Sequence, residues 1–85
     1  MPEFFWDELK NKRLKLTRGV SFDKLVTARF VNLIDHPTRE GQLIMLYEYQ
    51  NYIWAIPCIK IEKGLFLKTL YPSRKYTKIY LGGNL

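Results

Sequence analysis

The stretch LIMLYEYQNYIWAIPCIKIEKGLFLKTLY, residues 43–71, decides the fold. It contains three runs rich in β-branched and aromatic residues, at 43–50, 52–62 and 65–71. Runs of this length and composition are typical of strands. We therefore expect the second half of the chain to build a β-sheet.

The segments Gln50–Asn51 and Lys63–Gly64 separate these runs and are short enough for tight turns. Two tight turns predict an antiparallel meander of two hairpins. Pro57 lacks the amide hydrogen that a central ladder uses. The long middle run is therefore expected to contain a bulge near Pro57, or to present that position where no partner is required.

A turn at Lys63–Gly64 would pair Lys60 with Leu67 and place Lys60, Thr69 and Tyr71 on one face. On that face the Tyr71 ring would stack on a base while the Lys60 ammonium meets phosphate. An equally weighted interpretation places these residues at the border of a helix-covered core, with their polar ends in solvent.

Before the sheet, Phe4–Trp6 suits a short strand, and Asp7 is suited to cap a helix over 8–18 that ends at Gly19. Ser21 is suited to cap a second helix that would cover the sheet. The apolar face of this second helix is expected from residues at helical spacing: Phe22, Leu25, Val26, Arg29 and Phe30. The segment 35–42 contains Pro37 and Gly41 and predicts an exposed loop.

After the last strand, Pro72 ends the β-structure and Ser73 is suited to cap a short helix that carries Arg74, Lys75 and Lys78. Gly82 and Gly83 would then release the chain. The fold class expected from all elements is α+β, with two N-terminal helices packed on a twisted antiparallel sheet and a short C-terminal helix.

The bulk composition predicts one folded domain over 1–85, since 47% of the residues are hydrophobic and 15% are aromatic. The single cysteine, Cys58, lies in an apolar run and is interpreted as a core residue in a protein of the reducing cytoplasm. No secretory leader or membrane-spanning run is recognised. A cytoplasmic protein without membrane contact is therefore expected.

The formal net charge is +6, and no acidic residue follows Glu62. A basic surface of this kind attracts the phosphates of RNA, and it would equally attract an acidic protein partner. The residues expected to bind RNA are basic: Lys10, Arg18, Lys68, Lys75 and Lys78.

One cysteine and one histidine do not supply a zinc cluster, and the chain has no phosphate-binding glycine loop, so no cofactor or metal is expected. RNA cleavage needs neither, because the substrate's 2′-hydroxyl is the nucleophile and the protein supplies proton transfer and charge. Arg74 suits the cation of the transition state. His36 is the default proton-transfer candidate, with Lys60 and Tyr71 as further catalytic candidates. The competing interpretation is a solvated basic surface.

Several motifs, in order, resemble the BrnT group of ribonuclease toxins in the RelE-like superfamily. The resemblance includes the acidic, histidine-containing loop 35–42, and the chain departs from the group's pattern at Arg18, where a histidine is common. The other matching positions are Trp6, Asp7, Lys10, Asn11, Gly19–Phe22, Arg74, Lys75 and Thr77.

The resemblance implies a RelE-like fold and a bacterial toxin that cleaves mRNA without a metal and inhibits translation. It also implies a cognate antitoxin, usually with a ribbon-helix-helix DNA-binding domain, through which alone the complex would bind operator DNA. Two alternatives stay open: a non-catalytic protein that binds RNA or antitoxin, and a ParE-like gyrase inhibitor.

Overall fold

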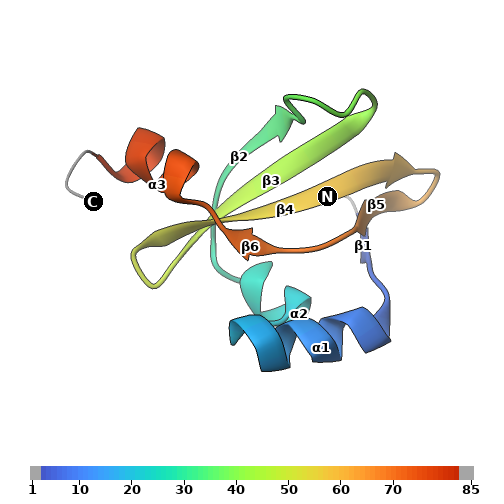
Figure 1. The fold of residues 1–85 in the computed structure, drawn as a ribbon. Helices are drawn as coiled ribbons and strands as arrows, with labels where there is room; N and C mark the ends of the chain where they lie inside the picture. Colours follow the sequence, from blue (N-terminus) through green and yellow to red (C-terminus); the bar gives the residue numbers. More distant parts are fainter. Residues whose placement is uncertain (1–2, 83–85) are drawn as a thin grey trace.

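The computed structural model describes residues 3–82 and has a mixed sheet with helices at both of its faces (Figure 1). The strands run in the order β1-β5-β4-β3-β2, and β6 pairs with β4. Along the chain the elements are β1 (Glu3–Phe5), α1 (Glu8–Arg18), α2 (Phe22–Leu25), β2 (Arg29–Asp35), β3 (Gln42–Tyr49), β4 (Tyr52–Ile61), β5 (Gly64–Leu67), β6 (Tyr71–Pro72) and α3 (Arg74–Leu81).

The α+β class is confirmed, but the sheet is mixed and not wholly antiparallel. Strand β1 pairs with β5 in parallel, with Glu3 opposite Gly64 and Phe5 opposite Phe66. A Cβ atom at Gly64 would lie 2.1 Å from the backbone oxygen of Glu3. Gly64 is therefore the residue that allows β1 to join the sheet.

The first helix has both predicted ends. The carboxylate of Asp7 accepts hydrogen bonds from the amides of Leu9 (2.9 Å) and Lys10 (3.2 Å), which are unpaired inside the helix. Gly19 ends the helix with φ 80°, and its amide donates to the carbonyl of Lys15.

The second helix is a single turn, so the prediction that it extends to Phe30 was wrong. Residues Arg29–Asp35 form the edge strand β2, which pairs with β3. A bulge between Phe30 and Asn32 places Phe30 opposite Tyr47 and Leu33 opposite Met45. Phe30 and Leu33 thus share a face although they are three residues apart, because the bulge adds a residue. A spacing of three residues between apolar side chains on one face is also typical of a helix.

The first hairpin is confirmed, and the second has a different register. Gln50 and Asn51 both have positive φ, 53° and 61°, as a two-residue type I′ turn requires. In the second hairpin Ile61 is opposite Gly64 and Lys60 is opposite Leu65, not Leu67. The turn therefore lies one residue earlier than predicted, because Gly64 is the first residue of β5, where it pairs with Glu3 of β1.

Strand β4 runs through Pro57 without a bulge, with unbroken pairing to β3. The carbonyl of Pro57 accepts from the amide of Lys68 (2.8 Å), so the backbone of Pro57 faces the β5 side. There β5 ends at Leu67, and the chain forms no strand again until Tyr71. The second of the two predicted solutions fits this ending of β5, because Pro57 has no amide hydrogen with which to continue the ladder.

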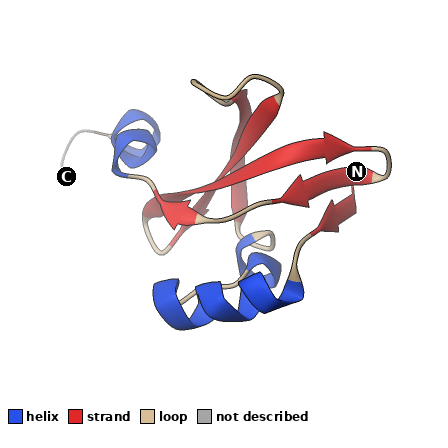
Figure 2. Cartoon of the chain, turned by 45° about the vertical axis from the view of Figure 1, so that its right-hand side comes forward, coloured by secondary structure: helices blue, strands red, loops and turns tan. Residues whose placement is uncertain are grey.

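Two hydrophobic clusters lie on opposite faces of the sheet. Figure 2 shows α1 and α2, which pack on one of them, well separated from α3. On one face, Leu14 of α1 and Phe22 and Leu25 of α2 pack on strand residues that include Ile56. On the other face, the side chain of Tyr76 from α3 packs with a smaller cluster around Ile53. Helices therefore pack on both faces of the sheet, and they do not cover the strand ends that lie away from them.

Candidate functional site

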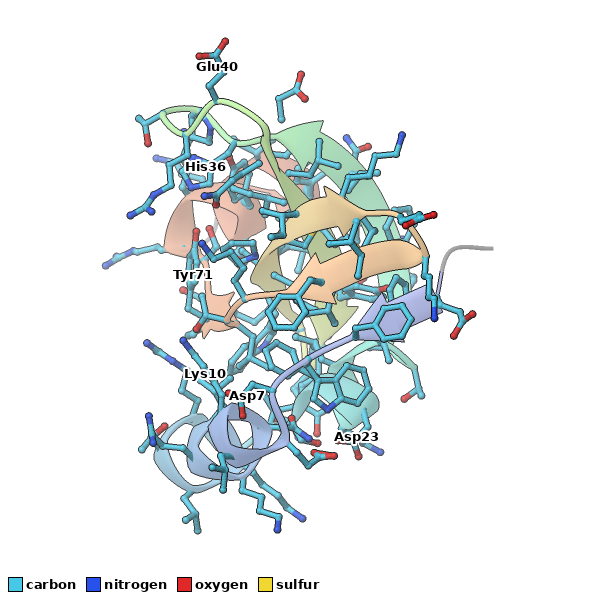
Figure 3. The ribbon with its side chains drawn as sticks, turned by 90° about the vertical axis from the view of Figure 1, so that its right-hand side faces the viewer. Asp7, Lys10, Asp23, His36, Glu40 and Tyr71 are labelled. Atoms are coloured by element: carbon cyan, nitrogen blue, oxygen red, sulfur yellow. The ribbon has the colours of Figure 1, made fainter. Side chains whose placement is uncertain are left out.

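A shallow cleft of about 420 Å³ lies where the loop after β2 meets the end of β4. His36 from the loop and Lys60 from β4 both line it, together with Arg39 and two carboxylates, Asp35 and Glu40. The cleft thus joins two of the predicted catalytic residues. Figure 3 places His36 and Glu40 at one end of the molecule, far from Asp7 and Lys10 at the other.

The imidazole of His36 organises its own loop. Its Nδ1 accepts hydrogen bonds from the backbone amides of Thr38 (3.2 Å) and Arg39 (3.1 Å). A nitrogen that accepts two hydrogen bonds carries no proton, so in the neutral ring the proton lies on Nε2. In this tautomer His36 is a hydrogen-bond donor to the cleft through Nε2, suited to bind a phosphate oxygen.

Lys60 is exposed and borders two adjoining hollows. It lines the cleft at His36 and a second hollow of about 370 Å³ beside β5, and Leu43 lies in the wall of both. An exposed ammonium between two hollows is well placed for a phosphate of an extended strand.

Tyr71 does not share a face with Lys60, which corrects the predicted arrangement. It is opposite Ala55, while Leu67 is opposite Cys58, so the register shifts by one residue between β5 and β6. The shift turns Tyr71 to the face of Ile53 and Tyr76. Burial, and secondarily Tyr76, raises the pKa of the half-buried Tyr71 phenol, which favours a role as donor over base.

Helix α3 presents the predicted basic residues of the C-terminal segment. Ser73 caps it, since its hydroxyl accepts from the amide of Tyr76 (3.1 Å). Arg74, Lys75 and Lys78 are exposed on this helix. The ammonium of Lys75 lies 5.4 Å from the centre of the Tyr76 ring, and the guanidinium of Arg74 forms no hydrogen bond or ion pair with other residues in 3–82.

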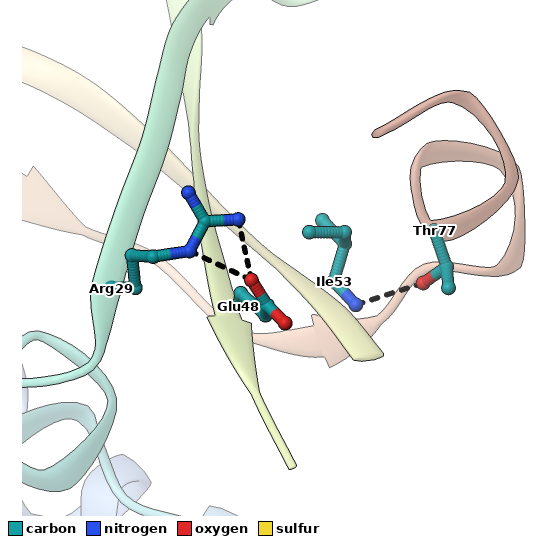
Figure 4. A network of polar contacts seen from close by, with 4 residues as sticks. All are labelled: Arg29, Glu48, Ile53 and Thr77. Carbon is teal, nitrogen blue, oxygen red and sulfur yellow. Dashed lines mark hydrogen bonds and ion pairs between the residues drawn. The ribbon is translucent and has the colours of Figure 1, made fainter. Parts of the chain in front are cut away.

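Thr77 fixes α3 to the sheet, a role that the sequence did not reveal. Its side chain is fully buried, and its Oγ1 accepts from the amide of Ile53 (2.8 Å) (Figure 4). The same hydroxyl donates to the carbonyl of Ser73 (2.6 Å), whose amide donates to the carbonyl of Ile53 (2.8 Å). Ser73 and Thr77 thereby fix the first turn of α3, which carries Arg74, to strand β4.

Asn11 has a comparable role at the other end of the molecule. Its side-chain oxygen accepts from the buried amide of Phe22 (2.7 Å), and its Nδ2 donates to the carboxylates of Asp23 (2.9 Å) and Glu8 (3.0 Å). The hydrogen bond from Asn11 lowers the pKa of the Asp23 carboxyl. The Lys-Asn pair of α1 thus has a structural meaning, because its asparagine holds the start of α2.

The remaining predicted RNA-binding residues lie apart from the cleft. Lys10 is half-buried on α1 and Arg18 is exposed in its last turn, whereas Lys68 follows β5. The predicted basic residues of the site therefore lie at the cleft, on α3, on α1 and, for Lys68, just after β5. Cys58, by contrast, is fully buried, and its burial raises the pKa of the thiol to about 11, as expected of a core residue.

Known structures include one with a similar fold. The crystal structure of the Brucella abortus ribonuclease toxin BrnT superposes with a TM-score of 0.56, covering 86% of this chain and 97% of that one. This chain has the BrnT fold. The two sequences are 18% identical over the match, so the likeness establishes the fold. No protein-family model and no curated protein matches the chain.

The BrnT fold bears out the resemblance seen in the sequence motifs. Nearly all of the toxin is covered by this chain, so the two domains have about the same extent. Within residues 3–82, no helix is long and apolar enough to cross a membrane.

Proposed function

We propose that this chain is the toxin of a bacterial type II toxin–antitoxin system, a metal-independent endoribonuclease that cleaves mRNA and inhibits translation in the cytoplasm. The observation that carries the proposal is the fold shared with a protein described as a ribonuclease toxin. The net charge of +6 supports a polyanionic substrate.

In the proposed reaction the 2′-hydroxyl oxygen attacks the adjacent phosphorus and its proton passes to water. The bond from phosphorus to the 5′-oxygen breaks, and that oxygen takes up a proton from water. The products are a 2′,3′-cyclic phosphate and a 5′-hydroxyl. Arg74 stabilises the developing phosphorane charge, His36 donates a hydrogen bond through Nε2 to a phosphate oxygen, and Lys60, Lys75 and Lys78 hold the strand.

The proposed partner is a cognate antitoxin with a ribbon-helix-helix domain, and operator DNA would be bound only through that complex. A gene for such a protein beside this one would support the assignment.

The chemistry is tested with purified protein, single-stranded RNA and EDTA at low ionic strength. We expect fragments with 2′,3′-cyclic phosphate and 5′-hydroxyl ends. Protein of verified fold that neither binds nor cuts the RNA would overturn the proposal.

The assignment of Arg74 is tested separately, in growth assays and with purified protein. We expect Arg74→Ala to lower cleavage at least a hundredfold and to abolish growth arrest, whereas Lys63→Ala leaves both unchanged. Arrest that survives in a folded Arg74→Ala variant removes Arg74 as the catalytic cation. Arrest with DNA-damage signalling and intact mRNA would instead identify a gyrase inhibitor.

A further inference from the structure

The outer surface of α1 carries two leucines that contact nothing in the core. Leu9 is 72% exposed and Leu16 is 86% exposed. They are seven residues apart, which places them on one side of the helix, about 10 Å from each other. The buried residues Asn11 and Leu14 lie on the opposite side, where α1 faces the rest of the molecule (Figure 1).

Between the two leucines lie Lys12 and Arg13, both exposed. Helical spacing puts these four residues on one outward stripe, which we call the α1 outer face: Leu9, Lys12, Arg13 and Leu16. The helix carries five basic residues and one acidic residue, Glu8. The ion pair found within residues 3–82 is Arg29–Glu48, so the cations of α1 form no ion pair in this part of the chain.

We propose that the α1 outer face binds an acidic amphipathic helix of a partner protein, with leucine-type side chains against Leu9 and Leu16 and carboxylates against Lys12 and Arg13. Apolar side chains exposed to this degree gain free energy when a partner's apolar groups bury them. A second copy of this chain does not fit, because its α1 would bring five cations against five. RNA would use the cations but would leave the leucines in water.

The inference rests on the proposed function only for the natural source of such a helix, which would be the antitoxin. Docking at α1 is separate from the cleft at His36, which lies at the other end of the molecule (Figure 3). Loss of docking should therefore leave the cleavage of RNA unchanged.

The test uses a designed peptide of three heptads, with leucine at the two apolar heptad positions and glutamate at the flanking positions, and a scrambled peptide of the same composition. Binding is measured by fluorescence anisotropy at physiological salt. We expect the full chain to bind the patterned peptide at least tenfold more tightly than the scrambled one. Equal binding of both peptides, or binding of neither, would overturn the proposal.

The double variant Leu9→Gln/Leu16→Gln should lose this preference for the patterned peptide, because its leucines would have no apolar surface to contact. The matched control is Ile79→Gln on α3, where Ile79 is 60% exposed. It removes an exposed apolar side chain elsewhere and should keep the preference. Circular dichroism should show unchanged folding for both. An equal loss in both variants would count against the α1 outer face.

Two further arms separate other ligands. With vesicles of phosphatidylglycerol and phosphatidylcholine, the leucine variant should bind as the parent does. If the variant binds the vesicles more weakly than the parent, and the parent does not prefer the patterned peptide, the α1 outer face is a lipid-binding surface and the proposal is overturned. In the RNA assay the leucine variant should cut as the parent does. If parent and variant both fail to cut RNA while the peptide preference holds, the proposed function fails and the docking surface stands.

Discussion

The two nitrogens of His36 have different tasks. Nδ1 holds the loop through the amides of Thr38 and Arg39, and Nε2 is left to the cleft. Asparagine can replace the first task, since its side-chain oxygen lies near the position of Nδ1, and glutamine can place a donor near Nε2. Substitutions can therefore separate loop structure from chemistry.

We expect His36→Asn to keep the loop and to lower RNA cleavage about a hundredfold, the effect typical of a lost hydrogen-bond donor to the transition state. His36→Gln should retain more activity than His36→Asn, although its loop loses the two amide hydrogen bonds. Single-turnover cleavage rates and amide spectra of residues 36–42 check both statements. Full activity in His36→Asn would remove His36 from the proposed mechanism.

Asn11 provides a test of stability at one residue. Asn11→Ala leaves the buried amide of Phe22 unpaired and should lower the free energy of unfolding by about 1–3 kcal/mol. Urea unfolding measures the change, and the exposed neighbour Lys12→Ala is the control. A loss no larger than that of the control would contradict this account of Asn11.

The same variant has a predicted pH dependence. The hydrogen bond from Asn11 lowers the pKa of Asp23 in the folded state, so it stabilises the fold above the ordinary carboxyl pKa. This contribution is lost as the pH falls through the folded pKa. In Asn11→Ala the pKa of Asp23 should rise toward its ordinary value, which a carboxyl chemical-shift titration measures, and the stability gap to the parent should narrow in acid.

At the scale of elements, the join between β1 and β5 depends on the absence of a side chain. Gly64→Ala would drive a Cβ into the backbone of Glu3, so β1 must shift or detach. We expect a loss of about 1–3 kcal/mol and faster amide exchange in β1, measured by hydrogen exchange. Lys63→Ala, in the same turn, is the control and should change neither.

The elements divide into those that local signals predict and those that tertiary pairing decides. Helix α1 and the first hairpin are predicted well, because Asp7, Gly19 and Gln50–Asn51 act within a few residues. Strand β2 is missed because a bulge gives it helical spacing. The parallel join of β1 has no local signal at all.

The candidate site follows the same division. Its residue types are readable in the sequence, since His36, Lys60 and Arg74 each suit phosphate chemistry. Their positions are not, because a one-residue register shift between β5 and β6 sends Tyr71 to the other face. Thr77 was missed because a buried threonine on a basic helix carries no signal of its hydrogen bond to Ile53.

At the scale of the whole molecule, the exposed basic residues lie in separate regions for which we propose different functions. Lys60 is proposed to bind RNA, and the α1 outer face is proposed to bind a partner protein. RNA affinity should fall as salt rises, and each phosphate contact on a single strand contributes about 0.7 to the slope of log K against log salt. Lys60→Gln should therefore reduce that slope by about 0.7, whereas Lys12→Gln on the α1 outer face should not. Titrations across a range of salt concentrations measure both, and equal slopes for the two variants would contradict this division.

The pairing of β1 with β5 also bears on synthesis. Residues 3–5 are made before their partner strand, residues 64–67, which follows some sixty positions later. Strand β1 therefore stays unpaired on the ribosome until most of the sheet has been synthesised. The join of β1 to β5 is thus among the last parts of the fold to form during translation.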